Sequence, residues 1–128
     1  MAQVSRGAIG EVLAARFLRD KKWDILTANY RCRFGEIDII AKDKSYIVFV
    51  EVKTRSVGAL VSPAEAVTKG KQRKIIQTAG LFLQRYKTKL QPRFDVIEVW
   101  TKKEDPLVAE EINHIIGAYE TEGLHAAF

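Results

Sequence analysis

Three acids and a lysine lie within two short apolar segments of the chain. Glu36 and Asp38 open the first segment, and Glu51 and Lys53 lie near the end of the second. Both segments are otherwise rich in isoleucine, valine and phenylalanine, which predicts buried strands. A buried charge without a partner costs on the order of several kcal/mol. We therefore expect these residues to hold a metal ion or to perform acid–base chemistry.

The spacing of the charged residues favours a metal site. Glu51 and Lys53 are two positions apart, so on a strand both side chains project from one face. Asp38 lies opposite them if the two strands pair as a hairpin. Two converging carboxylates form a hard oxygen site suited to Mg²⁺ or Mn²⁺, and the backbone carbonyl of Val52 lies between them as a third oxygen. Lys53 adds a cation that can hold a phosphate oxygen or the attacking water, so the set suits phosphodiester hydrolysis.

An internal ion pair is the alternative explanation for these charges. In that arrangement Lys53 neutralises either Asp38 or Glu51. The pairing leaves one of the two acids without a counter-charge inside the sheet, which is costly. We therefore favour the metal site.

A helix is expected over residues 4–19, because apolar residues recur there with a helical period. Glu11 lies on this helix, and its neighbours three, four and seven positions away are small or apolar. It therefore either meets a partner from another element or faces a cleft. Gly7 and Gly10 each cost the helix about 1 kcal/mol relative to alanine. Their missing side chains leave room for another backbone or a ligand on that face.

Three strands are expected next, over residues 23–30, 36–42 and 46–54. Alternation along the middle strand divides its residues between two faces: Glu36, Asp38 and Ile40 on one, and Ile37, Ile39 and Ala41 on the other. The third strand is apolar on both faces, which is typical of a central strand covered by helices on both sides.

A second, long helix follows the strands. Residues 62–65 (Ser-Pro-Ala-Glu) have the form of a capping box with proline at the first helical position, and the regular part of the helix is expected to begin near Lys69. Strands over residues 93–101 and 111–116 complete the chain. The order helix, three strands, helix, strand, with a short further strand, predicts a three-layer α/β/α fold with a central mixed sheet. The strands 46–54 and 93–101 should be parallel, and residues 1–128 should form one domain.

The chain is basic, with 21 Lys and Arg residues against 16 Asp and Glu and a pI of about 9.4. This balance favours a polyanionic partner, nucleic acid first. Several basic residues flank the acidic segments or begin the second helix: Arg31, Arg33, Arg55, Lys69, Lys71 and Lys74. They either contact phosphates or form a solvated surface.

Other classes of protein fit the composition poorly. No apolar stretch approaches the roughly 20 residues that span a bilayer, and the first residues lack a signal-peptide pattern, so we expect a soluble cytoplasmic protein without a membrane partner. The single Cys32 excludes an internal disulfide or a thiolate zinc cluster. His114 and His125 are too few and too far apart to suggest zinc, and each is expected to be structural or exposed.

The ordered motifs resemble a known group of nucleases. Asp-spacer-Glu-X-Lys on adjacent strands, after a helix that carries a glutamate, resembles the PD-(D/E)XK, or restriction-endonuclease-like, superfamily. The chain is more closely similar to the YraN-type family of small predicted endonucleases, related to archaeal Holliday-junction resolvases. The matching segments are residues 7–11 (Gly-Ala-Ile-Gly-Glu), 29–31 (Asn-Tyr-Arg), 35–41 (Gly-Glu-Ile-Asp-Ile-Ile-Ala), 49–55 (Phe-Val-Glu-Val-Lys-Thr-Arg) and 71–72 (Lys-Gln). Ile37 stands where the superfamily's proline precedes the aspartate.

The resemblance implies a restriction-endonuclease-like fold and a Mg²⁺- or Mn²⁺-dependent endonuclease that acts on DNA, including branched or damaged DNA. It makes Asp38 and Glu51 the metal carboxylates and Lys53 the catalytic lysine. Glu11 would bind a second metal or a water, and Gln72 would orient the lysine or contact the phosphate. Members of the superfamily often act as dimers, which makes a homodimer an expectation. The alternative is a non-catalytic nucleic-acid-binding module with the same fold, although such a module has no use for buried acids that repel phosphate.

Overall fold

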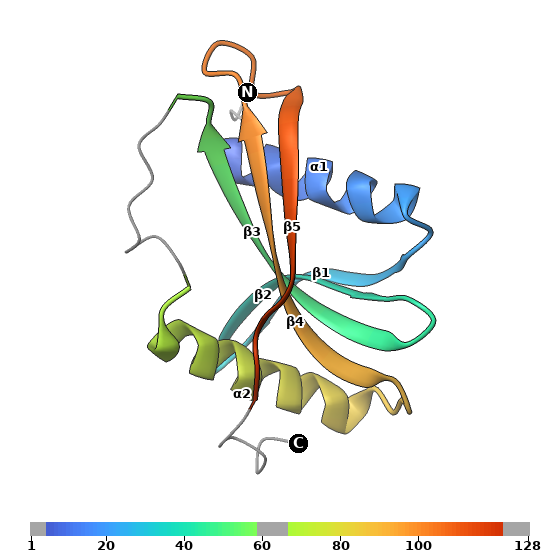
Figure 1. Ribbon diagram of the computed structural model, residues 1–128. Coiled ribbons are helices and arrows are strands. Elements are labelled where there is room, and N and C mark those ends of the chain that lie inside the picture. The colour runs from blue at the N-terminus through green and yellow to red at the C-terminus, as the bar shows by residue number, and fades with distance from the viewer. Residues whose placement is uncertain (1–4, 59–66, 122–128) are drawn as a thin grey trace.

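The computed structural model describes residues 5–58 and 67–121. Two helices, α1 (Arg6–Asp20) and α2 (Lys69–Arg85), lie on either side of a five-stranded sheet (Figure 1). The strands are β1 (Asp24–Cys32), β2 (Gly35–Lys42), β3 (Tyr46–Ser56), β4 (Gln91–Thr101) and β5 (Ala109–Tyr119). The predicted α/β class and element order are confirmed. No helix in the described ranges is long and apolar enough to span a membrane.

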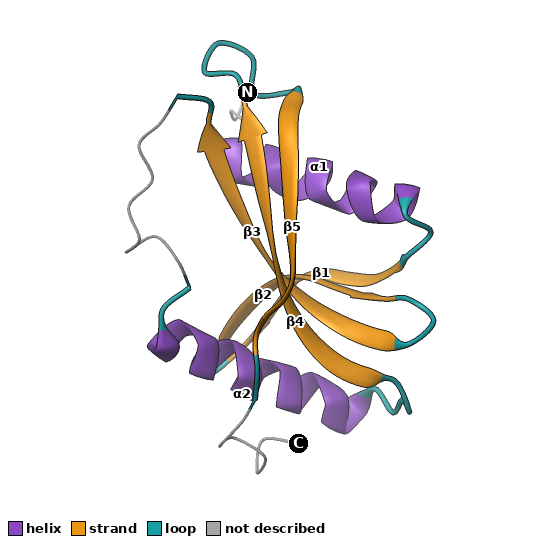
Figure 2. Cartoon of the chain, viewed as in Figure 1, coloured by secondary structure: helices purple, strands orange, loops and turns teal. Residues whose placement is uncertain are grey.

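The sheet is mixed, and its strand order follows the chain from β1 to β5. β3 and β4 pair in parallel along their length, with α2 in the connection between them. The other three pairs are antiparallel. Figure 2 shows the strands twisting as they pass between the helices. The predicted mixed sheet and the parallel pairing are therefore confirmed, and the long β3 lies at the centre.

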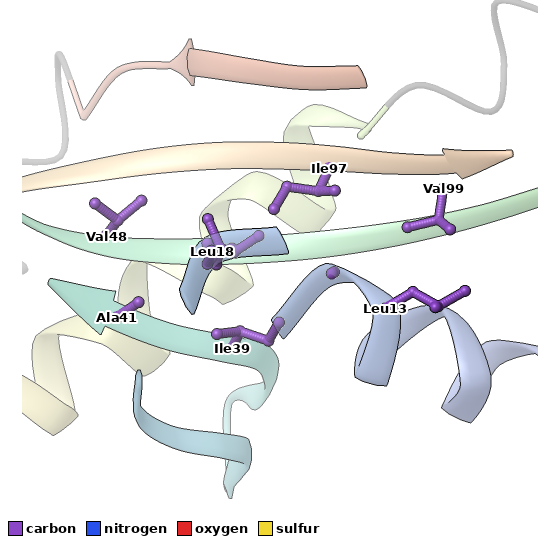
Figure 3. Packing of buried hydrophobic residues seen from close by; sticks show 9 residues of the cluster. Leu13, Leu18, Ile39, Ala41, Val48, Ile97 and Val99 are labelled. Carbon is purple, nitrogen blue, oxygen red and sulfur yellow. The ribbon is translucent and has the colours of Figure 1, made fainter. Parts of the chain in front are cut away.

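Each helix packs against its own face of the sheet. On the α1 side the buried residues are Leu13, Ala14, Leu18, Ile39, Ala41, Val48, Val50, Ile97 and Val99 (Figure 3). On the α2 side they are Ile37, Ile40, Ile47, Phe49, Ile75, Ile76, Ala79 and Phe94. Successive residues of β3 alternate between these clusters and are fully buried in both. Apolar residues on both faces of this strand are thus explained by a helix on each side, as predicted.

The start of β2 departs from the expected alternation. Ile37 packs on the α2 side together with Ile40, and not with Ile39 and Ala41 on the α1 side. The cause is the path of the strand, because β2 pairs with β3 only from Ile39 onward. Before that residue β2 is paired with β1 alone, and the period-two rule no longer assigns the face.

The extent of β5 also differs from the sequence expectation, whereas α2 begins where expected. β5 extends over eleven residues, almost twice the predicted length. Most of its residues are exposed, so it lacks the alternation that would reveal its ends. The capping box at residues 62–65 lies outside the described residues. The helix itself begins at Lys69 as expected, with the hydroxyl of Thr68 accepting a bond from the Lys71 N–H at 3.2 Å.

Helix α1 crosses β3 at very short range because residue 10 is glycine. A Cβ atom built at Gly10 would lie 1.9 Å from Oγ1 of Thr54 and 3.0 Å from its Cβ. Real Cβ atoms do not approach other atoms so closely, so only glycine permits this crossing. The expectation that the glycine face lets another element approach is confirmed for Gly10, and the approach brings Glu11 to the sheet.

Replacing Gly10 with alanine is expected to lower the free energy of unfolding by about 1–3 kcal/mol, because the overpacking outweighs the helix propensity gained. Gly7→Ala is the matched control, since its nearest neighbouring atom is the Ser5 Oγ at 4.0 Å. That variant should gain up to about 1 kcal/mol. Urea unfolding followed by circular dichroism measures both, and equal stability of the two variants would contradict the close crossing.

A buried ion cluster ties β4 and β5 to the end of α1. Asp95, which is fully buried, accepts two bonds of 2.9 Å from the Arg93 guanidinium and one of 3.0 Å from the Gly117 N–H. His114 Nε2 lies 2.7 Å from Asp95 Oδ2, and its Nδ1 lies 3.0 Å from the Lys21 ammonium. Since an ammonium only donates, Nδ1 accepts and Nε2 donates to the carboxylate. The predicted structural role of His114 fits this position.

Asp95→Ala is expected to lower the free energy of unfolding by about 3–5 kcal/mol at pH 7, because it leaves a guanidinium unpaired in the sheet. Burial alone would raise the pKa of Asp95, but the bonds from His114, Arg93 and Gly117 hold it below its ordinary value. The stabilisation is therefore present above about pH 4 and is lost as the pH falls through the lowered pKa. Urea unfolding at pH 7 and pH 3 should show the gap between variant and wild type narrowing in acid. A constant gap would be inconsistent with this role.

Candidate active site

Asp38 lies where β2 and β3 separate. The antiparallel pairing of these strands is confirmed, and Ile39 opposite Val50 is the last pair before Asp38. The Asp38 carboxylate fills the place of a strand partner, because its Oδ2 accepts a bond of 2.8 Å from the Val52 N–H. In a regular strand the N–H and C=O of one residue point toward the same neighbour. The Val52 carbonyl is therefore directed to the Asp38 side of β3.

Three carboxylates from two elements meet beside this gap. Glu11 of α1 and Glu36 and Asp38 of β2 each offer an oxygen, and the three oxygens lie within 4.8 Å of one another. We call these residues the acidic cluster. Glu11 and Asp38 were predicted to belong to one site, and the structure brings them together. Glu36 was not among the predicted ligands, although it shares a face with Asp38 in the alternation of the strand.

Asn29 of β1 joins the cluster through its side chain. With its amide nitrogen turned toward the acids, that nitrogen lies 3.2 Å from Glu11 Oε2 and 3.3 Å from Glu36 Oε1. The backbone of Asn29 has a φ of 53°, in the left-handed region that asparagine adopts more readily than most residues. Asn29 thus leaves the regular path of β1 opposite the cluster. Asn29 lies in one of the segments that resemble the YraN-type family (residues 29–31), but the resemblance implied no role for it.

The pKa of Asp38 is raised by its burial and by the neighbouring acids. Burial raises this pKa, and the negative charges of Glu51, Glu11 and Glu36 raise it further, to about 6. The bond from the Val52 N–H acts in the opposite direction, because it favours the ionised carboxylate, but it does not compensate. The ionised form of Asp38 is therefore disfavoured in this position by burial and by the neighbouring acids.

Glu51 is held by two lysines. It is 8% exposed, and its Oε1 lies 3.3 Å from the Nζ of Lys53, two residues further along β3. The same oxygen contacts the Nζ of Lys71 from the first turn of α2. Burial would lower the pKa of Lys71, but its bond and charge interaction with Glu51 raise it above the ordinary value. The sequence placed Lys71 among the phosphate contacts and did not predict its pairing with Glu51.

A cleft of about 640 Å³ opens between these strands and α2, and we call it the α2 cleft. It is lined by Gly35, Glu36, Asp38, Glu51, Thr68, Gly70, Lys71, Lys74 and Ile75. Its strand side carries carboxylates and its helix side carries ammonium groups. Such a division of charge suits a cation on the strands and an anion, such as a phosphate, against the helix.

The remaining predicted basic residues occupy different positions. Lys69 is exposed at the start of α2. Arg31 is largely exposed, and its Nε lies 2.8 Å from Glu36 Oε2, beside the acidic cluster. Arg33 is exposed, and its guanidinium carbon lies 4.8 Å from the centre of the Phe34 ring. These residues surround the cleft or the adjacent β1–β2 turn.

Arg55 and Gln72 are engaged within the protein. The Nε of Arg55 lies 3.0 Å from Glu98 Oε2, and its guanidinium lies 5.9 Å from the Trp100 ring centre. The Gln72 side-chain amide donates a bond of 2.9 Å to the Val67 carbonyl, at the entry to α2. Neither residue is among those that line the α2 cleft.

The fold and the site define an α/β protein with an acidic cluster beside a lysine-lined cleft. Residues 10–99 match the family described as "Uncharacterised protein family UPF0102", and the chain belongs to this family. It is the YraN-type family that the sequence motifs resemble. The matched range contains the acidic cluster, Glu51, Lys53 and Lys71.

Relatives at high identity extend over most of the chain. The chain is 46% identical over 114 residues to a UPF0102 protein of Caldanaerobacter subterraneus subsp. tengcongensis, which covers 88% of this chain and 93% of the relative. It is 50% identical over 95 residues to a UPF0102 protein of Clostridium botulinum strain Loch Maree, which covers 73% of this chain and 77% of the relative. These names state no activity.

Proposed function

We propose that this protein is a divalent-metal-dependent endonuclease that hydrolyses phosphodiester bonds in DNA, including branched or damaged DNA. The observation that carries the proposal is the meeting of Glu11, Glu36 and Asp38 within 4.8 Å, beside the Glu51–Lys53 pair. We also propose that the fold is restriction-endonuclease-like. Its support is the order of elements, with the Asp38 and Glu51 strands adjacent and α2 connecting the parallel β3 and β4.

The chemistry of the donor set fits a divalent ion. Carboxylate and carbonyl oxygens are the ligands that Mg²⁺ and Mn²⁺ prefer, and one or two carboxylates suffice for Mg²⁺. Burial, together with the nearby acids, raises the pKa of Asp38, and a bound cation would stabilise its ionised form. Asp38, Glu51 and the Val52 carbonyl would hold the cation, and Glu11 and Glu36 offer further oxygens within 4.8 Å of Asp38. A bound ion would polarise the phosphate and lower the pKa of a bound water.

The cationic side chains around the acids suit the rest of the reaction. Lys53 lies beside Glu51, where its ammonium can orient a water or stabilise the negative charge that develops on phosphorus. Lys71 and Lys74 line the helix side of the α2 cleft, where they can hold the phosphates next to the cleaved one. A non-catalytic nucleic-acid-binding module would use the same lysines, but the acids would oppose its binding.

A cleavage assay tests this function. Labelled duplex, branched and single-stranded DNA and RNA are incubated with wild-type protein and Mn²⁺ or Mg²⁺, in parallel with Lys53→Ala. We expect the wild type to cleave at least one DNA form and the variant to lose about 10²–10⁴-fold in rate. Equal cleavage by the variant would identify a contaminant. Binding by the wild type without any cleavage would favour the non-catalytic module.

A further inference from the structure

The two lysines on Glu51 are held in different ways. Lys53 lies within the central strand β3, opposite Glu98 of β4, and its side chain is 24% exposed. Lys71 lies in the first turn of α2, and its side chain is 47% exposed and lines the α2 cleft. Rotation of side-chain bonds alone is therefore enough to move the Lys71 ammonium away from Glu51 into open space. Lys53 has no comparable freedom.

The contact between Lys71 and Glu51 competes with metal binding. Both ammonium groups approach the same oxygen, Oε1 of Glu51. A cation bound by Glu51 and Asp38 would be repelled by an ammonium on that oxygen, and the carboxylate has few free directions in which to accept both. Of the two lysines, the half-exposed Lys71 is the one that can leave.

The α2 cleft offers Lys71 a second partner. A phosphate in the cleft would lie between the strand acids and the helix lysines, within the space that Lys71 and Lys74 line. An ammonium released from Glu51 would then exchange a carboxylate for a phosphate without crossing an apolar region. The charge on Lys71 is thus satisfied in both positions.

Building on the proposed metal site, we propose that Lys71 is an exchangeable counter-ion, which neutralises Glu51 before metal binds and moves to a nucleic-acid phosphate once a divalent cation is bound. Metal and nucleic acid then strengthen each other's binding, because each favours the released position of Lys71. A fixed Lys71, which only tethers α2 to β3, would have no such effect. The charge of a fixed Lys71 would also weaken metal binding, but its ammonium would stay on Glu51 and stay protected from chemical labelling when a divalent cation binds.

Titration of Mn²⁺ into the protein, followed by electron paramagnetic resonance, measures how strongly Lys71 competes with the metal. The samples are wild type, Lys71→Met and Lys74→Met at the same pH and ionic strength. Lys74 is the matched control, because it lines the same cleft, and no ion pair to Glu51 is found for it among the described residues. We expect Lys71→Met to bind Mn²⁺ about 5- to 30-fold more tightly than wild type, as the competing cation is gone. Lys74→Met should change the affinity by less than about three-fold.

Acetylation of the wild type provides a second measurement that needs no variant. Lysines are labelled briefly with acetic anhydride and quantified by mass spectrometry, with and without Mn²⁺. Labelling of Lys71 should rise on addition of Mn²⁺ relative to Lys74 in the same sample, because an amine that has left Glu51 is more accessible to the reagent.

The outcomes distinguish this inference from the function on which it rests. Tighter Mn²⁺ binding in Lys71→Met alone, with increased labelling of Lys71 in the wild type, supports the exchange. Wild-type Mn²⁺ binding that is not strengthened in Lys71→Met overturns the exchange and leaves the metal site intact. An absence of Mn²⁺ binding in all three proteins overturns the proposed metal site and the exchange with it.

Discussion

In EDTA at pH 7.5, Asp38→Asn is expected to be more stable than wild type by about 1–2 kcal/mol. Ionised Asp38 is buried among Glu11, Glu36 and Glu51, which raises its pKa to about 6. A shift of this size corresponds to at most about 3 kcal/mol, and residual solvent screening reduces it. Asparagine keeps an oxygen for the Val52 N–H and removes the charge. Urea unfolding of the two proteins measures the difference.

The pH dependence of this gain has a definite sign. A carboxyl whose pKa is raised on folding costs nothing below its unfolded pKa of about 3.9, and its cost is complete above the folded pKa of about 6. The gap between Asp38→Asn and wild type should therefore open between about pH 4 and 6 and stay constant above. Glu104→Gln, at an exposed acid in the β4–β5 connection, serves as control. The interpretation fails if the gap is already present at pH 4, or if Asp38→Asn is the less stable protein.

Glu51→Gln is expected to reduce the single-turnover rate of DNA cleavage by about 10³-fold or more. The change keeps the size of a side chain that is almost fully buried, but it removes a carboxylate from the metal site and from the oxygen that Lys53 contacts. Single-turnover conditions isolate the chemical step from product release.

Glu111→Gln is the matched control for this measurement, because Glu111 is an exposed acid on β5 and does not line the α2 cleft. It should cleave within a few-fold of wild type. Comparable losses in the two variants would show that the defect is general and that Glu51 has no particular role in the reaction.

The positions of the site residues on β2 and β3 were predictable, because the face to which a strand residue points depends on its spacing along the chain. Two-residue spacing places Glu51 and Lys53 on one face, and the hairpin between β2 and β3 brings Asp38 next to them. The apolar neighbours of Glu11 indicated that it faces another element. Gly10 supplied the reason, since only an absent side chain allows α1 to approach Thr54 so closely.

Other features depend on tertiary contacts that no local pattern specifies. Ile37 changes face because β2 leaves β3 before residue 39, and the same departure opens the gap that Asp38 fills. The pairing of Lys71 with Glu51 depends on how α2 docks against the sheet. The spacing of apolar residues identified the buried side of α2. It does not determine which residue a long, flexible side chain such as that of Lys71 contacts.

The cluster around Asp95 illustrates the same limit. The sequence suggested that His114 is structural, but it did not identify Asp95 as its partner nineteen positions earlier. Pairing of β4 with β5 brings the two residues together, and the ends of β5 were themselves poorly marked because its residues are mostly exposed. Where a strand lacks a clear apolar face, the contacts that depend on its register cannot be read from the sequence.

The most direct test of the central claim is the rate of single-turnover DNA cleavage as a function of Mn²⁺ concentration, for wild type and Asp38→Asn. We expect the wild-type rate to be zero in EDTA and to saturate with Mn²⁺ over the range in which Mn²⁺ binds the protein. Asp38→Asn, folded and more stable, should show neither binding nor cleavage over that range. Cleavage by the wild type in EDTA, or undiminished cleavage by Asp38→Asn, would contradict a metal-dependent nuclease site at the acidic cluster.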